Sequence, residues 1–177
     1  MKTVAIIQAR MASTRFPGKV LYPIHGKPML QWVVEAVKRA KCVDEICIAT
    51  TDQRDDDDIC ATALALRVKT FRGESEDVLG RFWSAATMLR ADCIVRVCGD
   101  CPCLCSEFIY EVVSAVVHYG ADYAAVRDKR GEPLIIKPYG ITCEAFTRYV
   151  LDREVLSLNA DHEHVTKGMY TCLALMQ

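Results

Sequence analysis

The amino-acid sequence predicts an α/β fold, with a mostly parallel sheet covered by helices on both faces. Short apolar runs typical of buried strands alternate with longer segments whose apolar residues recur at helical spacing. This repeated order is that of βαβ units, which form parallel sheets between two helical layers. The chain has 177 residues, so we expect residues 1–177 to form a single domain.

Each expected element follows from a local pattern. Residues 3–7 are an apolar run typical of a buried strand, and residues 20–24 indicate a short extended piece before a turn. Pro28 suits the first position of a helix, because the amide hydrogen that proline lacks is not needed there, and this helix should extend to residue 40. Ser75 and Ser106 are suitable N-caps for helices that extend to residues 89 and 120. We also expect strands at residues 45–49, 68–71, 92–97, 122–127, 134–137 and 170–175, and helices at residues 56–66 and 144–150.

Charge and hydropathy limit the partners. The formal net charge is −1, which gives no overall preference for nucleic acid or a membrane surface, and no apolar run approaches membrane-spanning length. No secretory signal is recognisable, so we expect a cytoplasmic protein. The ten cysteines are therefore expected to be reduced. The spacing of Cys101, Cys103 and Cys105 is not that of a zinc or iron–sulfur site, so we expect no structural metal there.

The most informative segment is the loop at residues 8–19, which follows the first strand. It contains three cations and two hydroxyls, and no acidic residue: Arg10, Ser13, Thr14, Arg15 and Lys19. Such a loop at the carboxyl end of a strand lies where open α/β sheets bind anionic ligands. We expect a polyphosphate ligand, although a solvated basic turn is the alternative. The glycine spacing is neither that of a P-loop nor that of a dinucleotide fingerprint.

This loop resembles the first motif of the cytidylyltransferase family, which includes acylneuraminate and 3-deoxy-manno-octulosonate cytidylyltransferases. The resemblance is strongest to the spore coat polysaccharide biosynthesis protein F group, and it implies a Rossmann-like three-layer α/β/α fold of the nucleotide-diphospho-sugar transferase kind. It further implies that CTP and a divalent cation, Mg²⁺, bind here. Arg15 and Lys19 would act in catalysis. The nucleotide-binding positions would be Ala9, Arg10, Ser13, Thr14 and Gly18.

A carboxylate follows the strand expected at residues 92–97. Asp100 lies in the stretch Arg96-x-x-Gly99-Asp100-x-Pro102, and a hard oxygen ligand at that edge of the sheet suits Mg²⁺. The alternative is an Asx-type turn before the proline. The same stretch occurs in the family, and the resemblance implies that Asp100 binds the cation and contributes to catalysis.

Two further segments resemble the spore coat group. Residues 71–81 match its Phe-Arg-Gly-x-x-x-Asp-Val-Leu-x-Arg pattern, which implies that Arg72, Gly73, Asp77 and Arg81 border the nucleotide pocket. Asp77 and Arg81 could equally form a structural i, i+4 ion pair. Residues 163–166, Glu-His-Val-Thr, match a later stretch, for which we expect a structural or acceptor-pocket role.

One departure from the family concerns the cation. Thr142 stands where the group carries a second acidic residue, and Glu144, two residues further on an extended segment, would share its face and replace it as a metal ligand. The C-terminal part is also shorter than in relatives.

Taken together, the residues and the resemblance imply transfer of CMP from CTP to a sugar acid or related sugar, with release of pyrophosphate, for a cell-surface polysaccharide. A homodimer is possible. The alternatives are a non-catalytic nucleotide-binding relative that serves as a partner subunit, and a nucleotidyltransferase that uses another NTP and a sugar phosphate.

Overall fold

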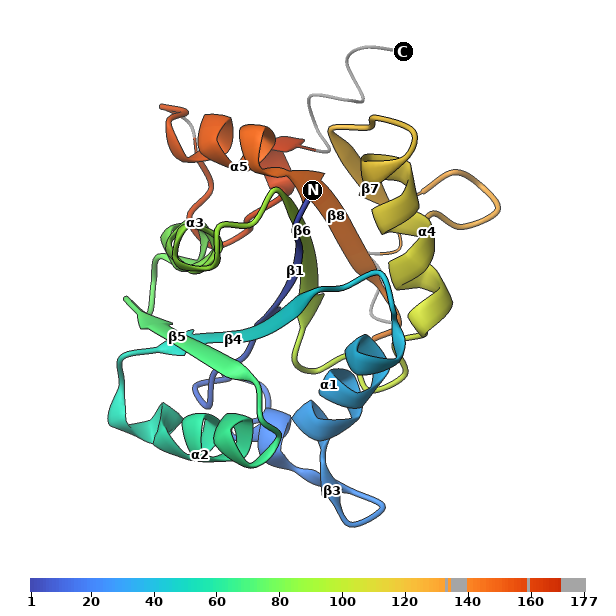
Figure 1. Cartoon of the computed structure of the whole chain (residues 1–177). Helices are drawn as coiled ribbons and strands as arrows, with labels where there is room; N and C mark the ends of the chain where they lie inside the picture. The colour runs from blue at the N-terminus through green and yellow to red at the C-terminus, as the bar shows by residue number, and fades with distance from the viewer. Residues whose placement is uncertain (133, 135–139, 159, 170–177) are drawn as a thin grey trace.

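A computed structural model describes residues 1–132, 134, 140–158 and 160–169 (Figure 1). Within these residues, the main sheet has six strands in the order β5-β4-β1-β6-β8-β7. Neighbouring strands from β5 to β6 are parallel, whereas β8 is antiparallel to both β6 and β7. The prediction of a mostly parallel sheet is confirmed. The strands are β1 (Thr3–Gln8), β4 (Glu45–Thr51), β5 (Lys69–Gly73), β6 (Cys93–Cys98), β7 (Tyr123–Ala125) and β8 (Cys143–Thr147).

Helices cover both faces of this sheet, as Figure 1 shows. The helices α1 (Met29–Arg39), α2 (Asp57–Ala65) and α4 (Ser106–Val117) pack on one face, and α3 (Val78–Leu89) and α5 (Arg148–Val155) pack on the other. Side chains of β1 alternate between the two cores: Ala5 and Ile7 belong to the first, Val4 and Ile6 to the second. The predicted three layers are confirmed. Among the described helices, none has the length and apolar character that crossing a membrane requires.

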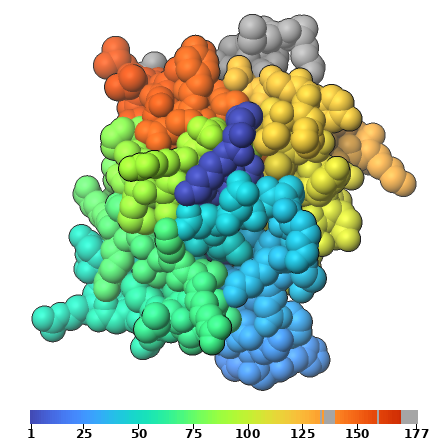
Figure 2. All heavy atoms as spheres, in the orientation of Figure 1, coloured from blue at the N-terminus to red at the C-terminus, as the bar shows by residue number. Residues whose placement is uncertain are grey.

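The start of the chain is fixed on the surface. Figure 2 shows the first residues packed between the segments of α3 and α4. The Lys2 ammonium donates to the Leu89 carbonyl oxygen at 2.6 Å and pairs with the Glu45 carboxylate at 2.8 Å. These contacts hold the entry to β1, the central strand from which the site loop extends.

The carboxyl ends of β1 and β6 lie together, because the two strands are parallel neighbours. The Gly99 amide donates to the Gln8 carbonyl oxygen at 2.8 Å, which joins the two loops just beyond the strands. A Cβ atom at Gly99 would lie 3.0 Å from that oxygen and 3.1 Å from Ala9 Cβ. Glycine is therefore required for this close approach, and it brings the two sequence motifs to one edge of the sheet.

Two expected elements are wrong. Residues 144–150 do not form one helix: β8 occupies Cys143–Thr147 and α5 begins at Arg148. The strand forms because residues 143–147 pair with both β6 and β7, and these tertiary contacts override the helical propensity of the sequence. Residues 20–24 are not one extended piece either, since a 3-10 helix at Lys19–Leu21 precedes the short strand β2 (Pro23–Ile24), which pairs with β3 (Lys27–Pro28).

Two helix starts differ from the expectation. Asp77, and not Ser75, caps α3, because its carboxylate accepts a hydrogen bond from the Gly80 amide at 2.8 Å. Helix α4 begins at Ser106 itself, with Cys105 at the N-cap position, and the Ser106 hydroxyl contacts Glu107. The other described elements lie within a few residues of their expected positions. The strands expected at residues 134–137 and 170–175 fall largely or wholly outside the described residues.

Candidate functional site

A cavity of about 310 Å³ opens where β1 and β6 end. Its size is at the lower end of the range for small-molecule pockets, about 300–1,000 Å³. The loop after β1 forms one wall, and residues from α3, from β6 with its following loop, and from the 163–164 segment form the rest. The structure therefore unites most of the residues that the sequence motifs indicated. Those that line the cavity are Ala9, Arg10, Ser13, Thr14, Arg15, Lys19, Arg81 and Asp100.

The cavity is rich in positive charge. Five cations line it, against the carboxylates of Asp100 and Glu163. Arg81 is only 4% exposed, and burial together with the nearby charge of Arg10 lowers its pKa. Its buried Nε atom has no hydrogen-bond partner in the described part of the chain. Such a concentration of cations favours an anionic ligand that carries several charges. The five cations are Arg10, Arg15, Lys19, Arg81 and Arg96.

Lys19 and Asp100 join the two motifs directly. The Lys19 ammonium, from the 3-10 helix after the loop, forms an ion pair with the Asp100 carboxylate that follows β6. Both side chains remain partly exposed, at 26% and 35%. Each group can therefore reach a ligand in the cavity, Lys19 as a hydrogen-bond donor to an anion and Asp100 as an oxygen ligand to a cation.

Glu144 has a different role from the one expected of it. Its carboxylate is completely buried and does not project to the cavity edge beside Asp100. It accepts a hydrogen bond from Arg96 Nη1 at 2.7 Å, one from the Thr166 hydroxyl at 3.0 Å and one from the Tyr123 hydroxyl. Glu144 thus lies away from the cavity edge at which it was expected to replace the missing acid at Thr142, and both of its oxygens already accept hydrogen bonds.

This cluster holds Arg96 at the cavity wall. The Arg96 guanidinium also donates from Nη1 to Thr166 at 3.0 Å and from Nε to Gln8 at 3.2 Å. Burial disfavours its charge, but the neighbouring Cys98 and Glu144 outweigh this effect and raise the pKa of Arg96. Arg96 is thus a fixed, permanently charged donor. The motif Arg96-x-x-Gly99-Asp100 hence contributes two side chains to the site, of which only Asp100 was expected.

A second buried carboxylate, that of Asp56, was not among the site residues expected from the sequence. It was expected only in the first turn of a helix, and it does lie at the end of a 3-10 helix (Arg54–Asp56) that leads into α2. Its side chain, however, turns inward and accepts hydrogen bonds from the Met11 amide at 2.7 Å, the Thr50 hydroxyl at 2.8 Å and the Thr51 amide at 3.0 Å. Asp56 therefore anchors the loop after β1 to the end of β4.

Replacing Asp56 by asparagine should lower the free energy of unfolding at pH 7 by about 1.5–3 kcal/mol, the range for hydrogen bonds to a charged group. Burial alone would raise the pKa of Asp56, but hydrogen bonds from Thr51, Met11 and Thr50 outweigh it and lower the pKa. The stabilisation is therefore present at neutral pH, and it should fade as the pH falls below about 4 and through the lowered pKa.

Urea unfolding of the parent and Asp56→Asn across this pH range measures the effect. The matched control is Asp58→Asn, because Asp58 belongs to the same run of aspartates at residues 55–58 but is exposed. A loss in Asp56→Asn no larger than in the control, or one that grows in acid, would contradict the anchoring role.

Four predicted nucleotide-binding residues do not line the cavity and shape its surroundings instead. Arg72 donates to the carbonyl oxygens of Thr51 at 2.9 Å and Gln53 at 2.7 Å. A Cβ atom at Gly73 would lie 2.9 Å from Arg81 Cγ, so this glycine makes room for the arginine. Gly18 has a positive φ of 72°, and its amide closes the loop on the Met11 carbonyl oxygen at 2.8 Å. The fourth is Asp77.

Asp77 connects α3 to the segment around residue 162. Besides capping the helix, its carboxylate contacts His162 Nδ1 at 2.8 Å. Asp77 does not form the alternative ion pair with Arg81. Instead, Arg81 Nη1 donates to the Ser75 carbonyl oxygen at 2.8 Å and to the Glu74 carbonyl oxygen. Helix α3 is thus joined to the segment that contains Glu163 and His164, which line the cavity.

The segment at residues 163–166 contributes to both the cavity wall and the core. Glu163 and His164 line the cavity, whereas Val165 is buried in the core beside α3 and Thr166 contacts Arg96 and Glu144. Two buried residues therefore hold two polar side chains at the cavity wall.

Comparison with known proteins identifies relatives of this chain. The family model for cytidylyltransferases matches residues 4–133. An uncharacterized protein of Methanocaldococcus jannaschii is 33% identical over 172 residues, which cover 96% of this chain and 68% of the relative. Spore coat polysaccharide biosynthesis protein SpsF of Bacillus subtilis is 36% identical over 68% of this chain and 52% of its own. A 3-deoxy-manno-octulosonate cytidylyltransferase of Bdellovibrio bacteriovorus is 37% identical over 66% and 47%. The chain thus spans about half the length of these last two relatives.

Solved structures share the fold. A cytidylyltransferase from Leptospira borgpetersenii superposes with a TM-score of 0.81 at 28% identity, over 94% of this chain and 70% of that one. The synthetase for CMP:2-keto-3-deoxy-manno-octonic acid, solved in complex with CTP, superposes with a TM-score of 0.71 at 22% identity, over 99% and 86%. At that identity the second similarity concerns the fold alone. The Rossmann-like fold predicted from the sequence is confirmed.

Proposed function

The chain belongs to the cytidylyltransferase family, as its motifs predicted, and we propose that it transfers CMP from CTP to a hydroxyl group of a sugar acid or related sugar. Pyrophosphate is released, and the CMP-sugar serves the synthesis of a cell-surface polysaccharide. The observation that carries the proposal is the cavity itself: five cations surround it, and a partly exposed carboxylate, Asp100, lies at its edge. The use of CTP places the reaction in the cytoplasm.

The cations of the cavity bind the triphosphate. Arg10 and Arg15 extend from the loop after β1 and Lys19 from the 3-10 helix that follows it. Each can form charge-assisted hydrogen bonds to phosphate oxygens, which are stronger than neutral ones. Arg96 and Arg81 face them from β6 and α3. Arg96 needs no rearrangement to act, because Glu144, Thr166 and Gln8 already hold its guanidinium.

Asp100 is the ligand for Mg²⁺. The donor set fits this ion, because Mg²⁺ in nucleotide sites is bound through one or two carboxylates together with substrate phosphates. When bound, the ion neutralises charge on the phosphate oxygens. Lys19 contacts Asp100 in the structure and can donate to a phosphate once the carboxylate binds the ion.

The reaction is a displacement at the α-phosphorus. The acceptor hydroxyl oxygen forms a bond to the α-phosphorus, the bond from that phosphorus to the bridging oxygen of the β-phosphate breaks, and the hydroxyl proton is lost to water. The protein contributes alignment and charge stabilisation rather than covalent chemistry. Glu163 and His164 lie at the cavity wall and can hydrogen-bond the acceptor.

Pyrophosphate release tests the proposal. The protein is incubated with CTP, Mg²⁺ and each of a panel of sugar acids, including 3-deoxy-manno-octulosonate and an acylneuraminate, and the nucleotide product is identified by mass spectrometry. We expect release with at least one acceptor, a CMP-sugar of matching mass, and none when the acceptor is omitted. CTP binding without release for every acceptor would favour the non-catalytic relative instead.

A further inference from the structure

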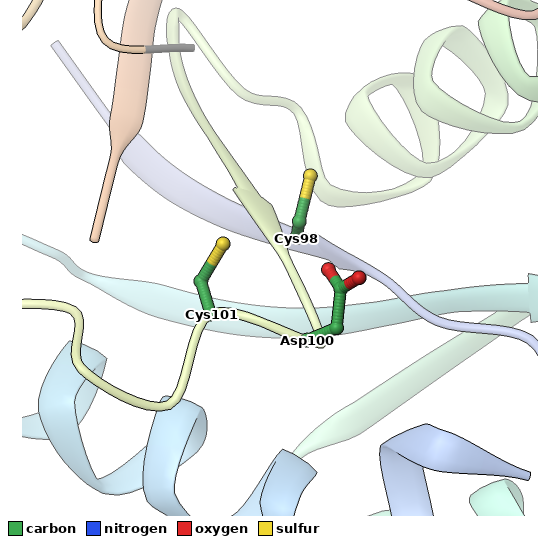
Figure 3. A group of neighbouring side chains, drawn as sticks. All are labelled: Cys98, Asp100 and Cys101. Carbon is green, nitrogen blue, oxygen red and sulfur yellow. The ribbon is translucent and has the colours of Figure 1, made fainter. Parts of the chain in front are cut away.

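Two thiols and a carboxylate meet at the end of β6. The sulfur atoms of Cys98 and Cys101 and a carboxylate oxygen of Asp100 all lie within 4.8 Å of one another. Figure 3 shows the three side chains projecting to the same side of the loop. These groups form a C-x-D-C sequence at the cavity edge, and we refer to them as the thiol–carboxylate cluster.

The backbone holds this cluster in place. The Cys101 amide donates to the Cys98 carbonyl oxygen at 3.1 Å, which closes a tight turn between the two thiols. The Gly99 amide binds Gln8, and the Leu104 amide donates to the Cys101 carbonyl oxygen at 3.1 Å. Because the turn is fixed from both sides, a cation would order little of the chain on binding, which lowers the entropic cost of binding.

The donor set suits a thiophilic cation. Zinc binds thiolate sulfur at about 2.3 Å and carboxylate oxygen at about 2.0–2.2 Å, so tetrahedral ligand atoms lie roughly 3.5–3.8 Å apart. The cluster spans at most 4.8 Å and reaches that spacing through a contraction of about 1 Å. Mg²⁺ does not use thiolate ligands, whereas Zn²⁺ does.

We propose that Cys98, Asp100 and Cys101 form a binding site for Zn²⁺ or a similar thiophilic divalent cation, with the fourth position open to water or a ligand oxygen. Sites with three protein ligands and one open position are common for zinc. This ligand set differs from the cysteines at positions 101, 103 and 105, whose spacing in the sequence is not that of a metal site. Cys103 is exposed and Cys105 contacts Glu107, so neither belongs to the cluster.

A cation here would also affect the neighbouring cavity. A cation bound to the two thiols would draw the Asp100 carboxylate away from Lys19, its ion-pair partner in the structure. It would also make this carboxylate unavailable to the Mg²⁺ that accompanies CTP. We therefore expect Zn²⁺ to compete with Mg²⁺ for Asp100. Only this consequence depends on the proposed function, because the site itself is defined by the thiols and can be tested without nucleotide.

Cobalt titration tests the site directly. The full chain, kept reduced with a phosphine, is titrated with Co²⁺ in the absence of CTP. We expect a near-ultraviolet sulfur-to-cobalt charge-transfer band and visible bands of a tetrahedral ion, which saturate at one Co²⁺ per chain and disappear on addition of Zn²⁺. Cys98→Ser and Cys101→Ser should each remove about half of the charge-transfer intensity and weaken Co²⁺ binding by more than about tenfold, since losing even an outer-sphere partner can cost that much.

The matched control is Cys103→Ser, which removes an exposed thiol of the same loop and should leave the spectrum unchanged. Asp100→Asn should keep the charge-transfer band and weaken binding. Circular dichroism confirms that each variant is folded. Absence of the band in the parent, or a band of undiminished intensity in Cys98→Ser and Cys101→Ser, would overturn the proposal. A failure of the proposed function would show separately, as absence of CTP binding with Mg²⁺ alone.

Discussion

Replacing Glu144 by alanine is expected to lower the free energy of unfolding by about 3–5 kcal/mol, the cost of removing one partner of a buried ion pair. Glu144 is fully buried and Arg96 is 8% exposed. The substitution leaves the Arg96 charge without its carboxylate, and it leaves Thr166 and Tyr123 without the acceptor that both hydroxyls use. Urea-induced unfolding at pH 7 measures the loss.

A surface ion pair is the matched control. Lys27 and Glu35 form one at 2.9 Å, with side chains that are 41% and 30% exposed. Glu35→Ala should cost less than about 1 kcal/mol, because water screens an exposed pair. If Glu144→Ala costs no more than Glu35→Ala, the buried cluster does not stabilise the protein. CTP affinity of the conservative variant Glu144→Gln, which keeps the volume, then reports on Arg96: it should fall while the fold is retained.

Removing either member of the Lys19–Asp100 pair is expected to abolish most of the pyrophosphate release. Lys19→Ala and Asp100→Asn should each lower the turnover rate by about 10²–10³-fold, the effect of removing one group that stabilises transition-state charge. Both side chains are partly exposed, so the free energy of unfolding should change by less than about 1 kcal/mol. A large loss of activity in a stable variant identifies a role in the reaction rather than in folding.

The control for this pair is Lys27→Ala, a lysine that lies outside the cavity and pairs with Glu35. It should release pyrophosphate at the rate of the parent. A second measurement is Mn²⁺ binding in the presence of CTP, followed by electron paramagnetic resonance, which Asp100→Asn should weaken and Lys27→Ala should not. Unchanged Mn²⁺ affinity in Asp100→Asn would show that this carboxylate does not bind the cation.

Elements with a local pattern could be predicted from the sequence. Strand β1 is an apolar run and α1 has its apolar residues on one face, so both were expected within a few residues of their bounds. Strand β8 was not. Its residues Cys143–Phe146 are all buried, so the strand shows no alternation of polar and apolar residues, and Glu144 and Ala145 are good helix formers. Only its pairing with β6 and β7 makes it a strand.

The residues of the site also fall into two groups, those that a contiguous motif indicates and those that only the fold brings together. The cations of the first loop and Asp100 belong to contiguous motifs, and all of them line the cavity. Asp56 and the partners of Arg96 could not be found in this way, because their contacts join residues that are 45, 48 and 70 positions apart. Arg72 is the opposite case, a residue of a matching motif that does not line the cavity. It lies in a matching motif, but β5 is an edge strand, and its side chain turns to the connection that follows β4.

Calorimetric titration of CTP in the presence of Mg²⁺ shows whether this cationic cavity binds a cytidine triphosphate. We expect one CTP per chain, weaker binding when Mg²⁺ is chelated, and weaker binding of ATP, GTP and UTP. Arg15→Ala should weaken CTP binding by more than about tenfold, as the loss of a charged hydrogen bond predicts, and Lys27→Ala should bind like the parent. Absence of CTP binding in the parent, or equal CTP affinity in Arg15→Ala and the parent, would show that this cavity is not the CTP site.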